Sequence, residues 1–157
     1  MVTQLSPDPE VHSLPMTTGL RHVHSYLAYA VLAALFITVI FAVWQLLNKR
    51  SFSESLRKTA LVAFILSHLQ LLFGILLYLV SPVGLSGFSG EAMQDSMARL
   101  YVLEHPLTML IAIIVITIGY LRAKRPGDDV RRYRTLILFY TLGLILILLR
   151  IPWMVWP

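Results

Sequence analysis

The chain has 157 residues, of which 57% are hydrophobic and only 13% are charged, and its net charge is +5. This composition is unusual for a soluble globular protein of this length and typical of integral membrane proteins. The sequence contains no cysteine, which excludes disulfides, thiolate metal ligands and cysteine nucleophiles.

Four apolar segments are each near the ~20 residues that cross ~30 Å of hydrocarbon as a helix. We predict that they span a membrane at about residues 20–47, 59–80, 100–121 and 133–150. Residues 1–18 have neither the basic region nor the cleavage site of a signal peptide, so we expect a short outer tail there. Residues 90–99 are expected to form an outer interfacial helix. The sequence therefore predicts an all-α, four-helix up-down bundle, with residues 1–157 as a single membrane domain.

Ten of the 13 Lys and Arg residues lie in or directly beside two loops, between the first and second and between the third and fourth segments. The positive-inside rule makes these loops cytoplasmic, so both termini are expected on the outer, periplasmic side. The other three basic residues lie near the outer surface: Arg21, Arg99 and Arg150. The net positive charge is explained by the basic residues of these loops. We therefore expect the protein to contact a lipid bilayer and not nucleic acid.

Pro106 lies near the start of the third segment, after a stretch with a helical pattern. It is compatible with the first position of a new helix and with a kink inside a longer one. We favour a kink, because the apolar span after Pro106 alone is slightly short.

Ionisable groups inside a membrane are costly, so the histidines are the first candidates for a functional site. Counted at ~1.5 Å per residue from the outer boundary, His24 and His105 reach similar depths on helices that run in the same direction. The match is poorer when it is counted from the inner loops. Facing imidazoles on two helices of a bundle can hold haem. We predict one haem b, with His24 and His105 as the metal ligands; the alternative is two interfacial histidines.

The chain also shows a weak internal repeat that relates these two histidines. Each half has a histidine, an apolar run, a basic inner loop and a returning helix that ends near a proline. If the halves are related by an axis along the membrane normal, His24 and His105 face each other across the bundle centre.

The remaining histidines are alternatives with weaker support. His22 and His24 are about 200° apart on a helix, so only one of them can face the core, and we choose His24. His68 lies much deeper, with no second histidine at its level. It is either a lower-ranked ligand or a polar group hydrogen-bonded to Gln70 or Ser67.

Further residues fit a haem pocket. Gly74 offers a flat site where a porphyrin can approach the backbone, although a glycine in a membrane helix also permits helix packing. Pro106 cannot donate to the carbonyl of Val102, which leaves that acceptor for the Nδ1 proton of a ligand histidine.

The three outer arginines are candidates to pair with haem propionates. Arg150 is the best placed of them, since it ends an otherwise uncharged span. The alternatives are snorkelling to lipid headgroups for Arg21 and Arg99, and a pair with Glu104 for Arg150.

Three short motifs carry a family resemblance: HSYLA at residues 24–28, LQLLFG at 69–74 and EHPLTM at 104–109. They resemble one half of haem A synthase, and the chain from about Gly19 to Trp153 is similar to small four-helix bacterial membrane proteins of the cytochrome b type. The resemblance implies haem between the first and third helices, ligated by His24 and His105, in a bacterial inner membrane. Haem A synthase has two such halves and this chain has one, which argues against synthase activity.

The preferred function is electron transfer by a multi-pass haem b protein, between quinone or the respiratory chain and an outward-facing partner. Two histidine ligands leave iron six-coordinate, which suits electron transfer better than oxygen activation. The second hypothesis is a cofactor-free accessory or assembly subunit of a membrane complex. The third, and weakest, is a haem A synthase-like enzyme, because Glu104 is the single carboxylate at membrane depth. A homo-oligomer and a larger complex both remain open.

Overall fold

The computed structural model describes residues 9–154 and 156, with side chains from Met16 onward, and no strand occurs among them. About 80% of the chain is helical. The elements are α1 (Pro9–Leu47), α2 (Glu54–Val80), the 3-10 turn η1 (Leu85–Gly87), α3 (Ser96–Arg99), the π-helical turn η2 (Leu100–Glu104), α4 (His105–Ala123) and α5 (Asp129–Arg150). Four helical stretches are long and apolar enough to cross a membrane: residues 16–47, 54–80, 96–123 and 129–150. The predicted all-α architecture with four long apolar helices is confirmed.

Two boundaries differ from the prediction. Helix α1 begins at Pro9, so residues 9–18 are helical and not a tail, while residues 1–8 lie outside the described residues. A proline at the first helical position loses no hydrogen bond, because that N–H has no partner within a helix. The expected interfacial helix at residues 90–99 is helical only from Ser96, and it continues into η2 and α4.

Side-chain caps explain where three helices begin. Ser53 precedes α2, and its Oγ accepts a hydrogen bond from the backbone N–H of Leu56 at 3.1 Å. Asp95 caps α3 and Asp128 caps α5 in the same way, each with a carboxylate oxygen 2.7 Å from a backbone nitrogen. Serine and aspartate are preferred at this position because a side-chain oxygen satisfies an N–H that the helix leaves free.

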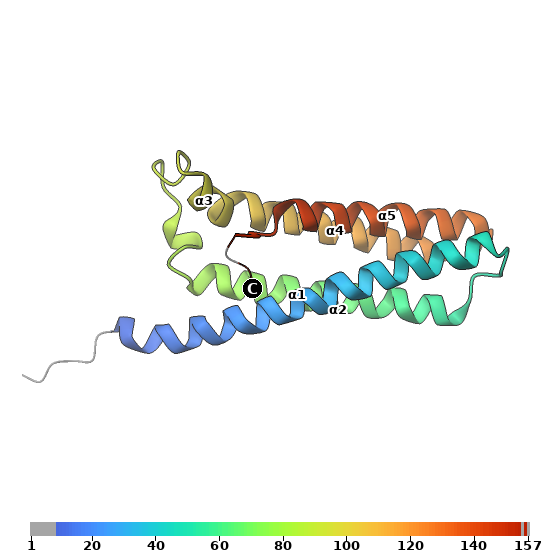
Figure 1. Cartoon of the computed structure of the whole chain (residues 1–157), viewed down its shortest axis with the longest axis horizontal. Coiled ribbons are helices and arrows are strands. Elements are labelled where there is room, and N and C mark those ends of the chain that lie inside the picture. Colours follow the sequence, from blue (N-terminus) through green and yellow to red (C-terminus); the bar gives the residue numbers. More distant parts are fainter. Residues whose placement is uncertain (1–8, 155, 157) are drawn as a thin grey trace, which may run out of the picture.

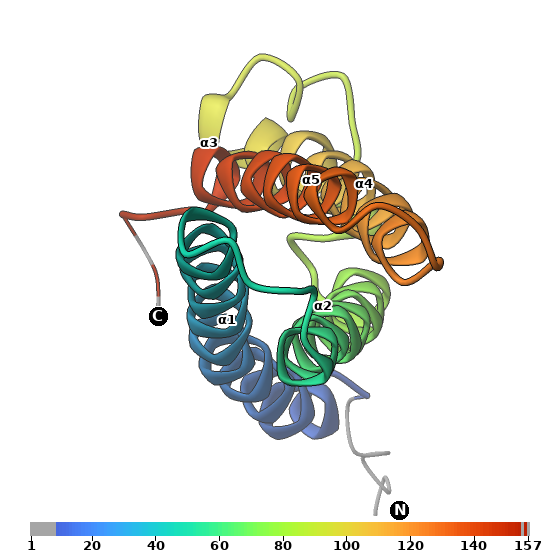
Figure 2. The same cartoon turned by 90° about the vertical axis from the view of Figure 1, so that its right-hand side faces the viewer.

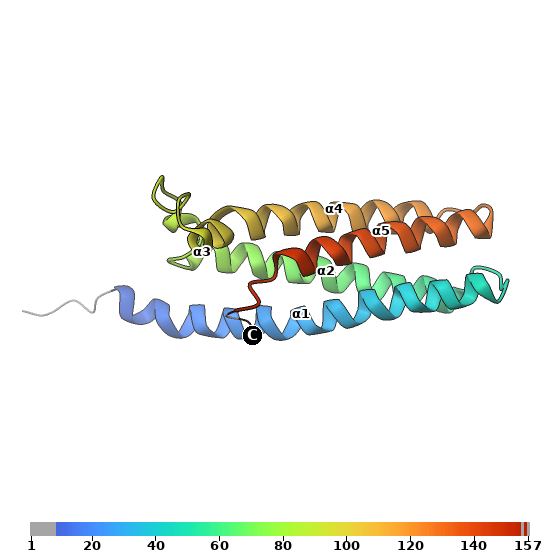
Figure 3. The same cartoon turned by 45° about the horizontal axis from the view of Figure 1, so that its top comes forward.

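The four long helices form a bundle in which each packs against two neighbours. Helix α1 contacts α2 and α5, and α4 contacts α5 and α2, so α1 and α4 lie on one diagonal of the square seen in Figure 2. One end of the bundle carries the loops at residues 48–53 and 124–128; we call it the basic end. The other end carries His24 and His105, and we call it the histidine end. Figures 1 and 3 show α1 continuing past the end of α5 at the histidine end.

The core is concentrated toward the basic end. Leu35, Leu56, Ile116 and Leu136 are fully buried there, and the hydroxyl of Tyr140 donates across the bundle to the carbonyl of Ala60 at 2.8 Å. Toward the histidine end, within the described chain, α2 contributes no buried residue after Ser67 and α4 none before Ala112. Val102, Ile147 and Ile151 are buried toward the histidine end, so the difference between the two ends concerns α2 and α4.

A hydrogen-bonded clasp closes the basic end. The hydroxyl of Tyr133 lies 2.8 Å from Oε1 of Gln45 and 2.9 Å from the carbonyl of Ser51. The amide nitrogen of Gln45 donates to Oγ of Ser53 at 2.8 Å, and the backbone N–H of Phe52 donates to the carboxylate of Asp129 at 3.0 Å. The loop at residues 48–53 is thereby joined to both α1 and α5.

We expect Tyr133→Phe to lower the stability of the bundle, because it leaves buried acceptors without a donor, at a cost of ~1–3 kcal/mol. Thermal unfolding of the detergent-purified protein should show a lower midpoint. Tyr26→Phe is the matched control, since Tyr26 is 68% exposed and should leave the midpoint unchanged. Equal midpoints for Tyr133→Phe and the wild type would contradict a stabilising role of the clasp.

Candidate functional site

His24 and His105 meet across the bundle at the histidine end. Their ring centroids are 6.3 Å apart and their ring planes are inclined by 78°. The two residues belong to α1 and α4, the helices on one diagonal of the bundle. His24 is partly buried between helices, whereas His22 is exposed and stacks on Tyr26, as their separation around the helix requires.

A backbone carbonyl orients the ring of His105. Its Nδ1 lies 2.8 Å from the carbonyl oxygen of Arg150. A carbonyl can only accept a hydrogen bond, so Nδ1 carries the proton and Nε2 keeps its lone pair. Arg150 is the last residue of α5, and the last carbonyls of a helix have no partner inside it. The end of α5 thus supplies an acceptor that nothing in the sequence identifies.

The predicted acceptor for this proton was wrong. The carbonyl of Val102 receives the hydroxyl of Tyr78 on α2, at 2.9 Å, and not a histidine proton. Pro106 still explains why that carbonyl is available, because proline has no N–H to donate to it. Tyr78 is therefore a residue of this region that the sequence did not suggest.

The helix in front of His105 is irregular. Residues 100–104 form a π turn, and the N–H of His105 bonds to the carbonyl of Leu100 five residues earlier. The helical path is continuous from Ser96 to Ala123, and Pro106 lies within it, in the first turn of α4 directly after the π turn. Single π turns are rare in proteins, and those that occur are often found at functional sites.

Gly74 leaves the space that the ring of His24 occupies. A Cβ added at Gly74 would lie 3.1 Å from Cε1 and 3.6 Å from Nδ1 of His24. The first distance is shorter than ordinary van der Waals contact, so a larger residue would have to displace the imidazole. Gly74 thus accommodates a candidate ligand directly.

Gln70, one turn before Gly74, also contacts His24. Its Nε2 donates to the backbone carbonyl of His24 at 2.9 Å and lies 3.2 and 3.3 Å from the two ring nitrogens. Its Oε1 is buried and has no hydrogen-bond partner among the described residues. Gln70 therefore belongs to the His24 site and does not pair with His68.

Charged side chains gather beside His105. Glu104 accepts from Nε of Arg99 at 2.8 Å, and Nε of Arg150 lies 3.8 Å from its other carboxylate oxygen. The expected alternative partner of Arg150 is thus present, and Glu104 also holds Arg99. Arg21, the third candidate, is exposed on α1.

His68 forms a separate polar contact deeper in the bundle. Its Nδ1 lies 2.8 Å from the carbonyl of Phe64, and its Nε2 lies 3.2 Å from Oγ1 of Thr117 on α4. These partners differ from the Gln70 or Ser67 that we expected. Both ring nitrogens are engaged, so His68 serves as a bridge between α2 and α4.

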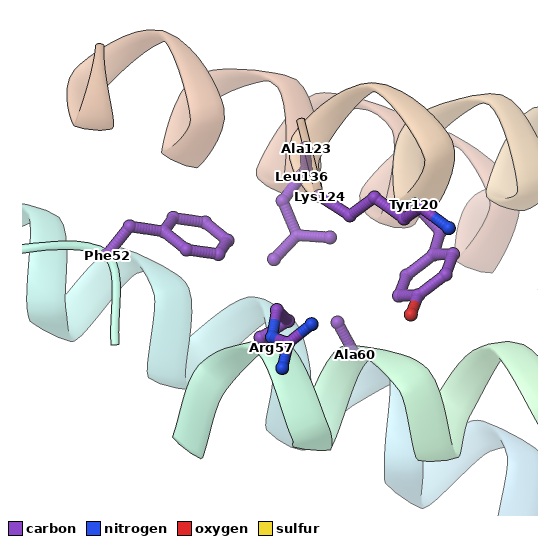
Figure 4. Close-up of a pocket in the computed structure, with 7 residues that line it drawn as sticks. All are labelled: Phe52, Arg57, Ala60, Tyr120, Ala123, Lys124 and Leu136. Atoms are coloured by element: carbon purple, nitrogen blue, oxygen red, sulfur yellow. The ribbon is translucent and has the colours of Figure 1, made fainter. Parts of the chain in front are cut away.

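The hollows that border the basic end do not reach the histidines. Phe52, Ala60, Tyr120 and Leu136 surround a cavity of about 10 Å³, with Arg57 and Lys124 at its edge. Figure 4 shows that these side chains converge between the loop and the long helices. Such a volume holds about one water molecule, so it is no cofactor site. A wider surface groove of about 260 Å³ follows the start of α5.

Within the part of the chain that the structure describes, no three His, Asp or Glu side chains are grouped to hold a metal ion. The histidine pair alone offers two ligands, which suits a metal whose other ligands come from a cofactor. No family model, curated protein or solved structure matches the chain. The candidate site therefore rests on the chain's own residues.

We expect Gly74→Ala to displace the ring of His24, because the new methyl group would lie 3.1 Å from its Cε1. Solution NMR of protein labelled at histidine should show shifted His24 ring signals and unchanged His68 signals. Gly19→Ala on α1 is the control, since a Cβ there meets nothing within 4 Å. Unmoved His24 signals in Gly74→Ala would show that Gly74 does not constrain the ring.

Proposed function

We propose that this chain is a membrane-spanning, cytochrome-b-like protein that binds one b-type haem between α1 and α4 and transfers single electrons. The observation that carries the proposal is the pair of imidazoles from diagonal helices, with ring centroids 6.3 Å apart. Imidazole nitrogens bind metals at about 2 Å, so two rings facing each other across one metal have centroids about 6 Å apart.

Three neighbouring features fit the same cofactor. The proton on Nδ1 of His105 is held by a carbonyl, which leaves Nε2 as the ligand atom. Toward the histidines, the described part of α2 has no buried residue after Ser67, and α4 has none before Ala112. The buried Oε1 of Gln70 has no partner within the described residues, and a site that lacks a component commonly contains such an atom.

The roles of the residues follow from these contacts. His24 and His105 would hold haem, which supplies one-electron redox chemistry at its iron. Gly74 keeps space for His24. Arg99 and Arg150 place two positive charges around the single carboxylate of Glu104, so one positive charge is left to attract a propionate. Two imidazole ligands leave no open coordination position, which favours electron transfer over oxygen chemistry.

The proposed environment is a bacterial inner membrane with the basic end in the cytoplasm and both termini in the periplasm. The support is the concentration of Lys and Arg in the loops of the basic end, which the positive-inside rule assigns to the cytoplasm. The haem would then lie near the outer surface, within reach of an outward-facing redox partner. Quinone or another respiratory-chain component would supply or receive the electron.

Visible spectra test the cofactor. Wild-type protein purified in detergent after expression with adequate haem should show a Soret band that moves on reduction with dithionite. We expect His24→Ala and His105→Ala to weaken haem binding at least about tenfold, since changes beyond the direct ligands already cost about that much. His22→Ala and His68→Ala are matched controls that should keep wild-type haem content.

Each outcome of the spectra decides a different point. Wild-type protein without haem bands would overturn the proposal and favour a cofactor-free accessory subunit. Full haem retention by His105→Ala would overturn the ligand assignment while leaving haem binding intact.

Cysteine labelling in intact cells tests the orientation, because the native chain has no cysteine. Ser51→Cys and Glu91→Cys place single thiols at exposed positions near opposite ends of the bundle. A membrane-impermeant maleimide should label Glu91→Cys and spare Ser51→Cys until the cells are lysed. The reverse pattern would invert the proposed topology.

A further inference from the structure

The two candidate ligands differ in how their second ring nitrogen is held. His105 donates from Nδ1 to the carbonyl of Arg150 at 2.8 Å. The hydrogen-bonding side-chain atom beside the ring of His24 is Nε2 of Gln70, which is a donor. Among the described residues, the protonated nitrogen of His24 therefore has no acceptor.

The orientation of the Gln70 amide is determined by its contact with α1. The carbonyl of His24 can only accept, and the Gln70 atom 2.9 Å from it must therefore be the nitrogen. The oxygen of the same amide, Oε1, is the buried acceptor that lacks a donor within the described chain. The ring N–H of His24 thus lacks an acceptor, and Oε1 of Gln70 lacks a donor, although the two side chains are in contact.

A rotation of the ring would pair them. Nε2 of Gln70 lies 3.2 Å from Nδ1 of His24, and Oε1 belongs to the same rigid amide group, so Oε1 is near the ring. The imidazole turns about its terminal torsion, which is a soft rotation. Gly74 has no side chain to oppose such a turn.

We propose that Gln70 is the positioning residue of His24 in the haem-loaded protein: its Oε1 accepts the Nδ1 proton of His24 while Nε2 of His24 serves as the ligand. This inference rests on the proposed function. It gives His24 the arrangement that His105 already has, with a glutamine amide in place of a helix-terminal carbonyl. Ligand histidines almost always donate their other N–H to such an acceptor, which fixes the ring and raises its basicity.

The arrangement has an electronic consequence. An acceptor on Nδ1–H makes the imidazole a stronger electron donor to its metal and favours the oxidised state. A stronger acceptor at position 70 should therefore lower the midpoint reduction potential, and loss of the acceptor should raise it. If Gln70 only filled space, replacing it with a weaker and with a stronger acceptor would not shift the midpoint potential in opposite directions.

Potentiometric titration of three proteins tests the inference: wild type, Gln70→Met and Gln70→Glu. Methionine keeps the length of the side chain and replaces the amide oxygen with a thioether sulfur, which is a weak acceptor, whereas glutamate keeps the length with a stronger acceptor. We expect the midpoint potential to rise in Gln70→Met and to fall in Gln70→Glu. Gln94→Met and Gln94→Glu are matched controls at an exposed position and should keep the wild-type potential.

The outcomes separate this inference from the proposed function. Absence of haem from the wild type overturns the proposed function and the inference with it. Haem in the wild type, with the potential unchanged or moved the same way in both Gln70 variants, overturns the inference alone. If Gln70→Met does not retain haem, Gln70→Glu decides, with a lower potential supporting the role and an unchanged or higher one overturning it.

Discussion

The hydrogen bond from Nδ1 of His105 to the carbonyl of Arg150 joins the start of α4 to the end of α5. It satisfies a carbonyl that α5 leaves free, and it fixes which nitrogen of His105 carries the proton. The adjacent ion pairs of Glu104 with Arg99 and Arg150 connect the same two helix ends. The direction of His105, and with it the whole candidate site, depends on this junction.

Different kinds of contact hold the helices together at the two ends of the bundle. At the basic end, buried aliphatic side chains and the hydroxyls of Tyr133 and Tyr140 hold the helices together. At the histidine end, hydrogen bonds between helices orient the two imidazoles: Gln70 donates to the carbonyl of His24, and His105 donates to the carbonyl of Arg150. Buried apolar side chains such as Val102 and Ile147 lie beside them.

The C-terminal segment adds a further contact between α5 and α1. Beyond Arg150 the chain crosses toward α1, where Trp156 packs on Tyr29 with ring centroids 4.2 Å apart (Figure 1). This segment follows directly on the carbonyl that holds His105. The carbonyl that holds His105 and the contact with α1, the helix that carries His24, thus lie at the two ends of the same short segment.

Much of the fold could be predicted from the sequence because long apolar runs indicate spanning helices with little ambiguity. The approach of His24 and His105 also followed from depth along two helices of the same direction. The exposure of His22 followed from its angular separation from His24 around the helix. The early start of α1 could not be predicted, since residues 9–18 include Pro9 and Pro15 and mix polar with apolar side chains. The acceptor of His105 and the partner of Val102 were missed for another reason, because backbone carbonyls and tyrosine hydroxyls are available everywhere in a sequence. Only the tertiary arrangement selects Arg150 and Tyr78.

The π turn before His105 has a consequence for how the short helix in front of it is oriented. A π turn is equivalent to one residue inserted into an α-helix, and one residue rotates everything beyond it by about 100°. Deleting a single codon between Leu100 and Glu104 would restore a regular helix and change the phase of His105 relative to Ser96–Arg99. His105 would keep its direction on α4, because it and the rest of that helix lie on the same side of the deletion. Ser96–Arg99 would turn instead, so the phase between Arg99 and His105 can be changed by one insertion or deletion event.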